Sequence, residues 1–157
     1  MKENDLAAVL EIESAAQFHP WTQQNFIECL RPDFLSLVAS CIPDGADNNG
    51  SDERVIGFAL LSTQVVEMEL LNIAVAAQYR GQGIAQDLLL ALKHRVTTSV
   101  LSDVAPAEQS IFLEVRESNL PAINLYKKFG FIQTGKRKNY YPTADGREAA
   151  LLFKLAI

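Results

Sequence analysis

The feature that most constrains the fold of this chain is an apolar segment that leads through a glycine-containing turn into an amphipathic helix. The apolar segment is Leu70–Val75, and the turn is Arg80-Gly81-Gln82-Gly83-Ile84-Ala85. The nearly continuous apolar run predicts a central β-strand that is covered on both faces. Apolar residues at helical spacing then predict a helix from about Gly83 to Val96. The chain is therefore expected to contain a strand–turn–helix unit near its middle.

This turn is suited to an anionic ligand. A strand that feeds a helix N-terminus brings several backbone N–H groups to one point, where the helix dipole also favours negative charge. Gly81 and Gly83 allow the main chain to approach phosphate oxygens closely, and Ala85 is small enough for the same purpose. The turn matches neither the dinucleotide-binding glycine pattern nor a P-loop. Taken alone, it is equally compatible with a tight connection that binds nothing.

Patterning along the remaining residues predicts one α/β domain that spans residues 1–157, with helices on both faces of a mixed sheet. The predicted order is ααβββαβαββ. The other helices are expected at 4–17, 22–31 and 118–130, and the strands at 34–41, 55–66, 68–75, 111–116, 131–137 and 148–155. Exposed loops are expected at 42–54 and 99–109, and turns at Tyr141-Pro142 and at 144–147.

Local signals mark several helix ends. Asn4 or Asp5 is expected to cap the first helix. Thr22 is expected to cap the second, with Trp21 and Phe26 packed together as a hydrophobic staple, and Arg31-Pro32 to end it. Further caps are expected at the last helix, with Ser118 or Asn119 at its start and Gly130 at its end.

Composition restricts the class of protein. Apolar residues make up 48% of the 157 residues and charged residues 21%, which is typical of a soluble globular domain. No apolar run reaches the roughly 20 residues of a membrane span, and the N-terminus lacks a signal-peptide pattern, so we expect a cytoplasmic protein that binds no membrane. A net charge of −5 disfavours direct nucleic-acid binding and suits a cationic substrate.

The cysteines and histidines indicate no metal site. Cys29 and Cys41 are expected to be reduced and structural, because two cysteines are too few for the disulfide framework of a small secreted domain. His19 and His94 have no partner at metal-ligand spacing, so both are expected to be structural or solvated.

The turn Arg80–Ala85 resembles the R/Q-x-x-G-x-G/A signature of the GNAT acetyltransferases. Further stretches resemble the bacterial ribosomal-protein alanine N-acetyltransferases (RimI type) within that family, and the similarity covers most of the chain. These stretches are His19-Pro20-Trp21, Asn72–Val75, Leu113–Asn119, Ala122–Phe131 and Asn139–Glu148. The chain departs from that pattern at Ala85, where glycine is usual, at Gln86, where a basic residue is frequent, and in two loops that look longer than typical.

The resemblance implies that acetyl-CoA is the acetyl donor. The strand Ile73–Val75 would contact its pantetheine and acetyl groups through the backbone, the segment from Gly81 to Gln86 would hold its pyrophosphate, and Asn119 would contact a more distal part. The implied cofactor-binding residues are Ile73, Ala74, Val75, Arg80, Gly81, Gln82, Gly83, Ile84, Ala85, Gln86, Asn119 and Tyr126.

Glu114 is the candidate general base for deprotonating the acceptor amine. It lies in an otherwise apolar predicted strand, where burial would raise its pKa toward a useful value. Strand alternation also puts Glu114 and Arg116 on one face, so the structural alternative is a carboxylate paired with Arg116 or another base at the sheet surface. Glu67 and Glu69 on the neighbouring strand are the next candidates for the base.

Tyr126 is the candidate general acid that would return a proton to the coenzyme A thiolate. Its place among Ala122, Leu125 and Phe129 on one helix face also fits an ordinary core aromatic. Trp21, Tyr140 and Tyr141 are candidate walls of a peptide groove, and ordinary packing is their alternative.

The acceptor implied by the resemblance is a protein N-terminal α-amine, in particular the N-terminal alanine of small-subunit ribosomal protein eighteen. One alternative keeps the fold but acetylates a small-molecule amine or a protein lysine. A second alternative is a non-catalytic module that binds acyl-CoA and regulates a partner. The protein is expected to be a monomer or a weak dimer.

Overall fold

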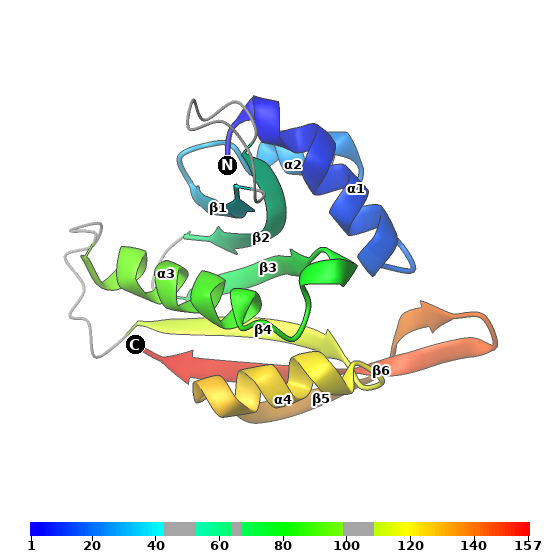
Figure 1. The fold of residues 1–157 in the computed structure, drawn as a ribbon. Helices are drawn as coiled ribbons and strands as arrows, with labels where there is room; N and C mark the ends of the chain where they lie inside the picture. The colour runs from blue at the N-terminus through cyan, green and yellow to red at the C-terminus, as the bar shows by residue number, and fades with distance from the viewer. Residues whose placement is uncertain (43–52, 64–66, 99–108) are drawn as a thin grey trace.

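The computed structural model describes residues 1–42, 53–63, 67–98 and 109–157. In this part of the chain, a six-stranded sheet has the order β1-β2-β3-β4-β6-β5 and is covered by helices (Figure 1). The strands are β1 (Phe34–Cys41), β2 (Arg54–Ser62), β3 (Glu67–Val75), β4 (Ser110–Arg116), β5 (Ile132–Thr143) and β6 (Gly146–Ala156). The helices are α1 (Leu6–Ala16), α2 (Gln23–Glu28), α3 (Ile84–Thr98) and α4 (Leu120–Phe129), with short 3-10 turns at Glu3–Asp5 and Ala77–Tyr79.

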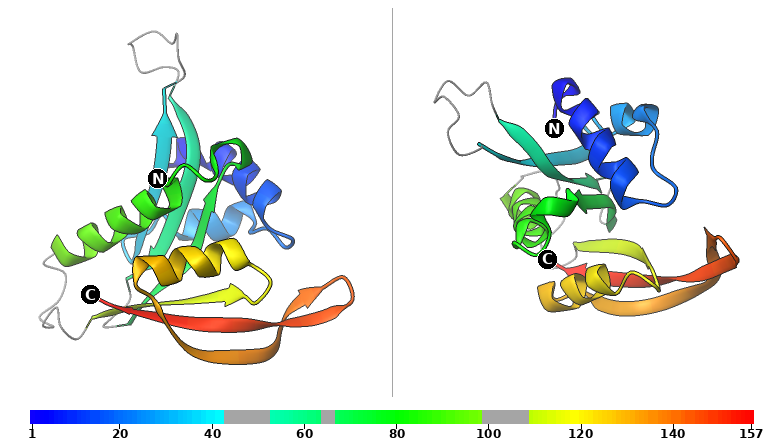
Figure 2. Two further views of the ribbon diagram at one scale, coloured as in Figure 1. Left: turned by 60° about the horizontal axis from the view of Figure 1, so that its bottom comes forward. Right: turned by 45° about the vertical axis from the view of Figure 1, so that its right-hand side comes forward.

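The sheet is mixed, because β3 and β4 pair in parallel while the other neighbouring strands pair antiparallel. Helices lie on both faces of the sheet (Figure 2), and an apolar cluster forms on each face. One cluster joins the sheet to α3 and α4 and includes Leu92, Leu113 and Phe153. The other joins the sheet to α1 and α2 and includes Phe26 and Phe58. The predicted element order and the mixed sheet with helices on both faces are confirmed.

The helix caps agree with the sequence in most places. Thr22 and Asn25 form a reciprocal capping box at α2, and the rings of Trp21 and Phe26 lie 5.5 Å apart, as the staple predicts. Asn119, rather than Ser118, caps α4 by accepting a hydrogen bond from the backbone N–H of Ala122. These contacts fix where α2 and α4 begin.

Asp5 occupies the predicted cap position of α1, one predicted helix end was wrong, and one helix start differs by a single residue. Asp5 precedes α1, but its carboxylate accepts from the backbone N–H of Lys2 rather than from a helix amide. Helix α2 ends at Glu28 rather than at Arg31, because the backbone N–H of Cys29 bonds also to Phe26 O and tightens the chain into a turn toward β1. Helix α3 starts at Ile84, since Gly83 has a positive φ of 86° that a helix does not allow.

The predicted turn at Tyr141-Pro142 was also wrong, because β5 runs on to Thr143. The ladder with β6 skips from Arg137 to Tyr141, so the extra residues form an irregularity at which Asn139 has a φ of 53°. The Arg147 guanidinium donates to the carbonyls of Asn139 and Tyr140 and braces this irregularity. The result is a long hairpin of β5 and β6, which reaches the end of the molecule where α1 also ends (Figures 1 and 2).

Most of the two predicted loops, at 42–54 and 99–109, and the last residues of the strand predicted at 55–66 lie outside the described residues.

Candidate active site

The strands β3 and β4 part in the middle of the sheet. In the part of the chain that the structure describes, their ladder joins only Glu67–Glu69 to Ser110–Phe112. Beyond Glu69, β3 continues to Val75, and beyond Phe112, β4 continues to Arg116, without a ladder between them. Backbone N–H and C=O groups of a strand that loses its neighbour are available to a ligand that lies in the gap.

A bulge in β3 lies at the start of this gap. Leu60 of β2 is opposite Asn72, but the next residue, Leu61, is opposite Leu70, so Leu71 is an extra residue. The bulge changes the alternation of the strand: Leu70 packs in the cluster under α3, whereas Leu71 and Ala74 pack in the cluster under α1. The bulge therefore re-aims the end of β3 where it borders the gap.

The glycine turn follows β3 directly. Gly81 and Gly83 have φ values of 76° and 86°, and a Cβ built on either residue would meet no atom within 4 Å. Both glycines are thus required by backbone conformation, and the space beside them is open. The first turn of α3 has N–H groups without intrahelical acceptors, and these point toward that space.

The gap between β3 and β4 and the glycine turn open into one cleft of about 960 Å³. All of the predicted site residues except Gln82 line it. These are Ile73, Ala74, Val75, Arg80, Gly81, Gly83, Ile84, Ala85, Gln86, Glu114, Asn119 and Tyr126. The side chain of Gln82 instead donates a hydrogen bond to the carbonyl of Gln78. The site residues predicted from the sequence, apart from Gln82, therefore lie together in this cleft.

Several of these side chains have partners inside the protein. The Arg80 guanidinium donates to the carbonyl of Val75 and ties the turn to the end of β3. The amide oxygen of Asn119 accepts from Ala122, so this side chain caps α4 and also borders the cleft. Both residues therefore have a structural function in addition to their position in the cleft.

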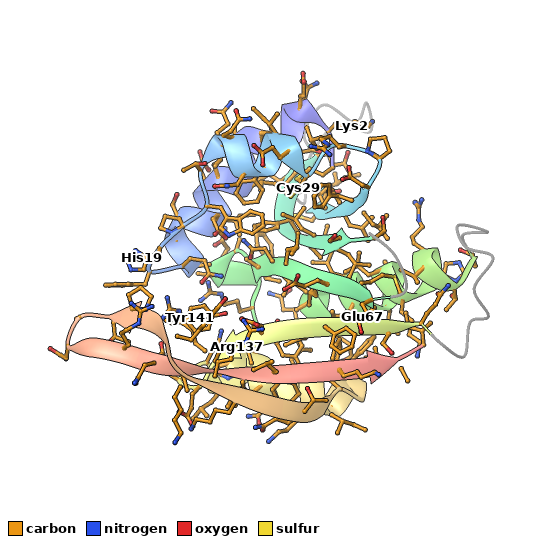
Figure 3. The ribbon with its side chains drawn as sticks, turned by 180° about the vertical axis from the view of Figure 1, so that it is seen from behind. Lys2, His19, Cys29, Glu67, Arg137 and Tyr141 are labelled. Atoms are coloured by element: carbon orange, nitrogen blue, oxygen red, sulfur yellow. The ribbon has the colours of Figure 1, made fainter. Side chains whose placement is uncertain are left out.

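Glu114 lies on β4 where the gap is open, and its side chain is 19% exposed. Its carboxylate pairs with the Arg137 guanidinium of β5 at 3.1 Å. The structural alternative, a carboxylate paired with Arg116 or another base at the sheet surface, is confirmed with Arg137 as the base, whereas Arg116 pairs with Glu148 at 2.8 Å. The other candidate bases are Glu67 and Glu69. Glu67 lies at the end of β3 that pairs with β4, away from Tyr141 and Arg137 (Figure 3).

Tyr126 of α4 is both a core aromatic and a cleft residue. Its ring packs against Phe131 and Phe153, with centroids 5.6 and 6.4 Å away, and the residue is 6% exposed. Burial, followed by the proximity of Tyr141, raises the pKa of the Tyr126 phenol above its ordinary value. The phenol is therefore protonated at neutral pH.

The part of the cleft near Glu114 lies between two segments. Residues 17–22, which join α1 to α2, contribute Gln17, His19 and Trp21, and the hairpin contributes Tyr141 (Figure 3). Burial and the proximity of the Glu114 carboxylate raise the pKa of Tyr141, which indicates that these two side chains are neighbours. Tyr140, the third aromatic residue predicted for the groove, does not line the cleft and is 40% exposed.

The hairpin is fixed to β4 by charged groups. Glu148 of β6 accepts from the Arg116 guanidinium and from the backbone N–H of Ser118. The Arg116 guanidinium also lies 4.4 Å from the centre of the Tyr141 ring and donates to the carbonyl of Pro142. This network sets where Tyr141 stands against the cleft.

Glu13 is the cleft residue that the sequence analysis missed. It lies on the apolar stripe of α1, is fully buried, and lines the cleft beside Asn72 and Trp21. Its place between Val9 and Ala16 on that stripe was the available signal, because an acid on an apolar helix face needs hydrogen-bond partners.

The cysteines and histidines agree with expectation where they are described. Cys29 is buried and Cys41 is partly buried, and both thiols are free. His19 stacks edge-on against Phe18 and borders the cleft, while His94 is exposed on α3. Among the described residues, no three potential metal ligands are grouped together, and no helix is long and apolar enough to cross a membrane.

Comparison with known proteins defines the class to which this fold and cleft belong. The model of the acetyltransferase (GNAT) family matches residues 6–131. The chain belongs to the GNAT acetyltransferase family.

Within the family, the chain is similar to one named group over its whole length. It is 34% identical to the ribosomal protein bS18-alanine N-acetyltransferase of Escherichia coli strain K12, over all of this chain and 95% of that one. The crystal structure of the ribosomal-protein-S18-alanine N-acetyltransferase from Escherichia coli superposes with a TM-score of 0.79 at 32% identity, covering 99% of this chain and 89% of that one. Arabidopsis thaliana NAA60 in complex with acetyl-CoA shares the fold, with a TM-score of 0.79 at 21% identity over 100% and 96% of the chains.

Proposed function

We propose that this protein transfers the acetyl group of acetyl-CoA to the N-terminal α-amine of a protein, and that the acceptor is the N-terminal alanine of ribosomal protein bS18. The observation that carries the proposal is the parting of β3 and β4 beside the glycine turn, with Glu114 facing the gap. The choice of acceptor is supported by full-length similarity to enzymes that are named for this reaction.

The gap and the turn fit the two parts of acetyl-CoA. The pantetheine arm is an extended amide chain, so it can pair with the free backbone edge of β3 at Ile73–Val75, as a further strand would. The pyrophosphate fits the N-terminus of α3, where Gly81 and Gly83 leave open space and the first helical N–H groups can donate to it. The thioester is then placed near the bulge, between β3 and β4.

Glu114 and Tyr126 would carry the proton transfers. Glu114, directly or through water, accepts a proton from the α-ammonium, and the neutral nitrogen attacks the thioester carbonyl carbon. A backbone N–H of β3 donates to the oxyanion that forms. The carbon–sulfur bond then breaks, and the departing thiolate takes a proton from the Tyr126 phenol, while the attacking nitrogen loses its second proton to solvent and the phenolate regains one from solvent. Burial raises the pKa of this phenol, so its proton is harder to give up than that of a free tyrosine and this is the more demanding of the two proton transfers.

An α-amine acceptor suits a site with one modest base. At pH 7, deprotonating an α-amine of pKa about 8 costs about 1.4 kcal/mol, whereas a lysine of pKa about 10.4 costs about 4.6 kcal/mol. Trp21 and Tyr141 provide apolar walls on the two sides of the acceptor end, between which the first residues of a peptide can lie. These features favour a peptide N-terminus over a lysine side chain.

Thiol release from acetyl-CoA with a panel of peptides tests the proposal. The panel holds the bS18 N-terminal sequence, the same sequence with other first residues, and an N-terminally blocked peptide whose only amine is a lysine. We expect turnover on the Ala-initiated peptide and little on the lysine peptide. Equal rates on all peptides would reject the acceptor, and cofactor binding without thiol release on any amine would favour a regulatory acyl-CoA-binding module.

A further inference from the structure

Glu13 is a buried carboxylate that the proposed chemistry does not use. Glu13, Asn72 and Ser110 are the buried polar residues among those that the structure describes, and only Glu13 can ionise. A carboxylate in this position is unfavourable unless hydrogen bonds compensate for the lost water. The hydrogen bonds of Glu13 therefore indicate its role in the structure.

The two oxygens of Glu13 connect three separate segments. Oε1 accepts from the backbone N–H of Trp21 at 3.0 Å, and Oε2 accepts from the side-chain amide of Asn72 at 3.1 Å. Helix α1 is thus joined both to the segment before α2 and to β3 at its bulge. Burial raises the pKa of the Glu13 carboxyl, and the two hydrogen bonds oppose that rise.

Glu13 is a principal tie of the acceptor-side wall, by which we mean residues 17–22. Three of them border the cleft: Gln17, His19 and Trp21. Among the described residues, the bond to Glu13 is the one hydrogen bond that joins residues 18–21 to another segment. The same carboxylate holds Asn72, which directly precedes the stretch of β3 that faces the gap.

We propose that Glu13 is a positioning residue that holds the acceptor-side wall against β3, so that the acceptor is seated opposite Tyr141 and next to the thioester. This inference rests on the proposed function. Glu13 is 0% exposed and its two oxygens already accept hydrogen bonds, so it acts through Trp21 and Asn72 and not on the acceptor itself.

A carboxylate is the side chain that this position requires. Two donors converge on it from different directions, and a carboxylate provides two acceptor oxygens on one short side chain. A glutamine in its place can keep both bonds only if the Asn72 amide rotates, so that its oxygen accepts from the new NH₂ group while the glutamine oxygen still accepts from Trp21. An alanine loses both bonds.

Steady-state kinetics of Glu13→Ala and Glu13→Gln test the proposal. In Glu13→Ala we expect the KM for the acceptor peptide to rise about tenfold, from the loss of buried hydrogen bonds, while the KM for acetyl-CoA changes less than about twofold. Glu13→Gln should stay within about threefold of the wild type. Glu11→Ala, an exposed acid on the same helix, is the matched control and should change neither constant.

A readout without turnover separates this inference from the proposed function. Trp21 is the only tryptophan of the chain, so its fluorescence reports the acceptor-side wall. We expect Glu13→Ala to shift its emission to the red and to increase quenching by acrylamide, with Glu13→Gln and Glu11→Ala unchanged. If Glu13→Ala does not fold, Glu13→Asp replaces it, because its carboxylate is one methylene shorter and cannot reach both donors.

The outcomes are distinct. Unchanged emission and an unchanged acceptor KM in Glu13→Ala would overturn the positioning role, as would an equal rise of both KM values. A Glu13→Gln variant that is as impaired in kcat as a general-base variant would show instead that Glu13 transfers a proton. Wild-type protein that acetylates no amine, in combination with a Trp21 shift in Glu13→Ala, would reject the proposed function and keep the structural tie.

Discussion

The two walls of the acceptor end are held by different physical means. The acceptor-side wall is tied through Glu13, which is fully buried and accepts from two uncharged donors. The hairpin wall is tied through partly exposed ion pairs: Arg116 with Glu148, whose side chains are 21% and 17% exposed, and Arg137 with Glu114, in which Arg137 is 55% exposed. Salt and pH act strongly on exposed charges and weakly on buried hydrogen bonds.

This difference in how the two walls are held indicates that they serve different functions in the cleft. A wall fixed by buried hydrogen bonds keeps its distance from β3 under all conditions in which the protein is folded. A wall fixed by partly exposed ion pairs can adjust, and one of these pairs holds Glu114 of β4, the carboxylate that faces the gap. One carboxylate therefore shapes the site, and the other is available for chemistry.

The largest expected effect follows from making the same chemical change at the two carboxylates to which the walls are tied. Glu114→Gln removes the proposed base and should lower kcat at neutral pH by about 10²- to 10⁴-fold, the usual range for general-base catalysis. Glu13→Gln should lower kcat only a few-fold. Calorimetry with coenzyme A should give the same affinity for both variants and the wild type, and similar kcat values for the two variants would end the distinction between the carboxylates.

Tyr126→Phe tests the second proposed proton transfer, to which neither Glu13 nor the acceptor-side wall contributes. The phenylalanine ring can keep the packing against Phe131 and Phe153, so stability should change little while kcat falls by about a hundredfold through loss of the proton donor. Thiol release and thermal unfolding measured together separate the two effects. Tyr140→Phe, which removes a phenol that does not line the cleft, is the control, and equal losses in both variants would reject the proposed acid.

Glu148→Gln should weaken the hairpin wall in a pH-dependent manner. Hydrogen bonds from Ser118 and from the Arg116 guanidinium hold the pKa of the Glu148 carboxyl below its ordinary value. Its contribution to stability is therefore present above the unfolded-state pKa and is lost as the pH falls through the lower folded-state pKa. We expect Glu148→Gln to lower the free energy of unfolding by about 1 kcal/mol at neutral pH.

Urea unfolding over a range of pH values checks this expectation. The difference between Glu148→Gln and the wild type should shrink as the pH is lowered below the ordinary carboxyl pKa. A difference that stays constant with pH would mean that packing, and not the ion pair, holds the hairpin, and the contrast between the walls would lose its electrostatic basis.

The sequence predicted the parts of the site that depend on local patterns. The glycine turn between β3 and α3, the cap at Asn119 and the end of α4 at Gly130 each follow from a few consecutive residues, and the structure has them there. Family resemblance added Glu114 and Tyr126, which the fold brings to one cleft. Local chemistry and a known motif were sufficient to select residues that line one cleft around the glycine turn.

The acceptor side could not be predicted in the same way because it depends on the register of distant strands. The sequence could offer Arg116, two residues away, as one possible partner of Glu114, but the actual partner is Arg137, which only the β4–β6–β5 arrangement brings near. The irregularity at Asn139 shifts the hairpin and turns Tyr141 to the cleft. The partner of Glu13, Asn72, is 59 residues away in sequence.

The smallest expected effect is that of Arg137→Gln, and it tests the exposed character of the hairpin wall most directly. An ion pair with one exposed partner contributes about 0–1 kcal/mol, so the free energy of unfolding should change by less than about 1 kcal/mol. Loss of the guanidinium should lower kcat only fewfold at low salt, because Glu114 loses a group that orients it. At about 0.5 M salt the wild type should approach the variant, since ions screen an exposed pair.

Lys138→Gln is the control for this variant, because it changes the net charge by the same amount on the next residue of β5. Its kcat should show little dependence on salt beyond that of the wild type. A loss of a hundredfold or more in Arg137→Gln that persists at high salt would place Arg137 in contact with the acceptor or the reacting atoms. The hairpin wall would then be as fixed as the acceptor-side wall, because a guanidinium shielded from solvent by the acceptor is not screened by salt.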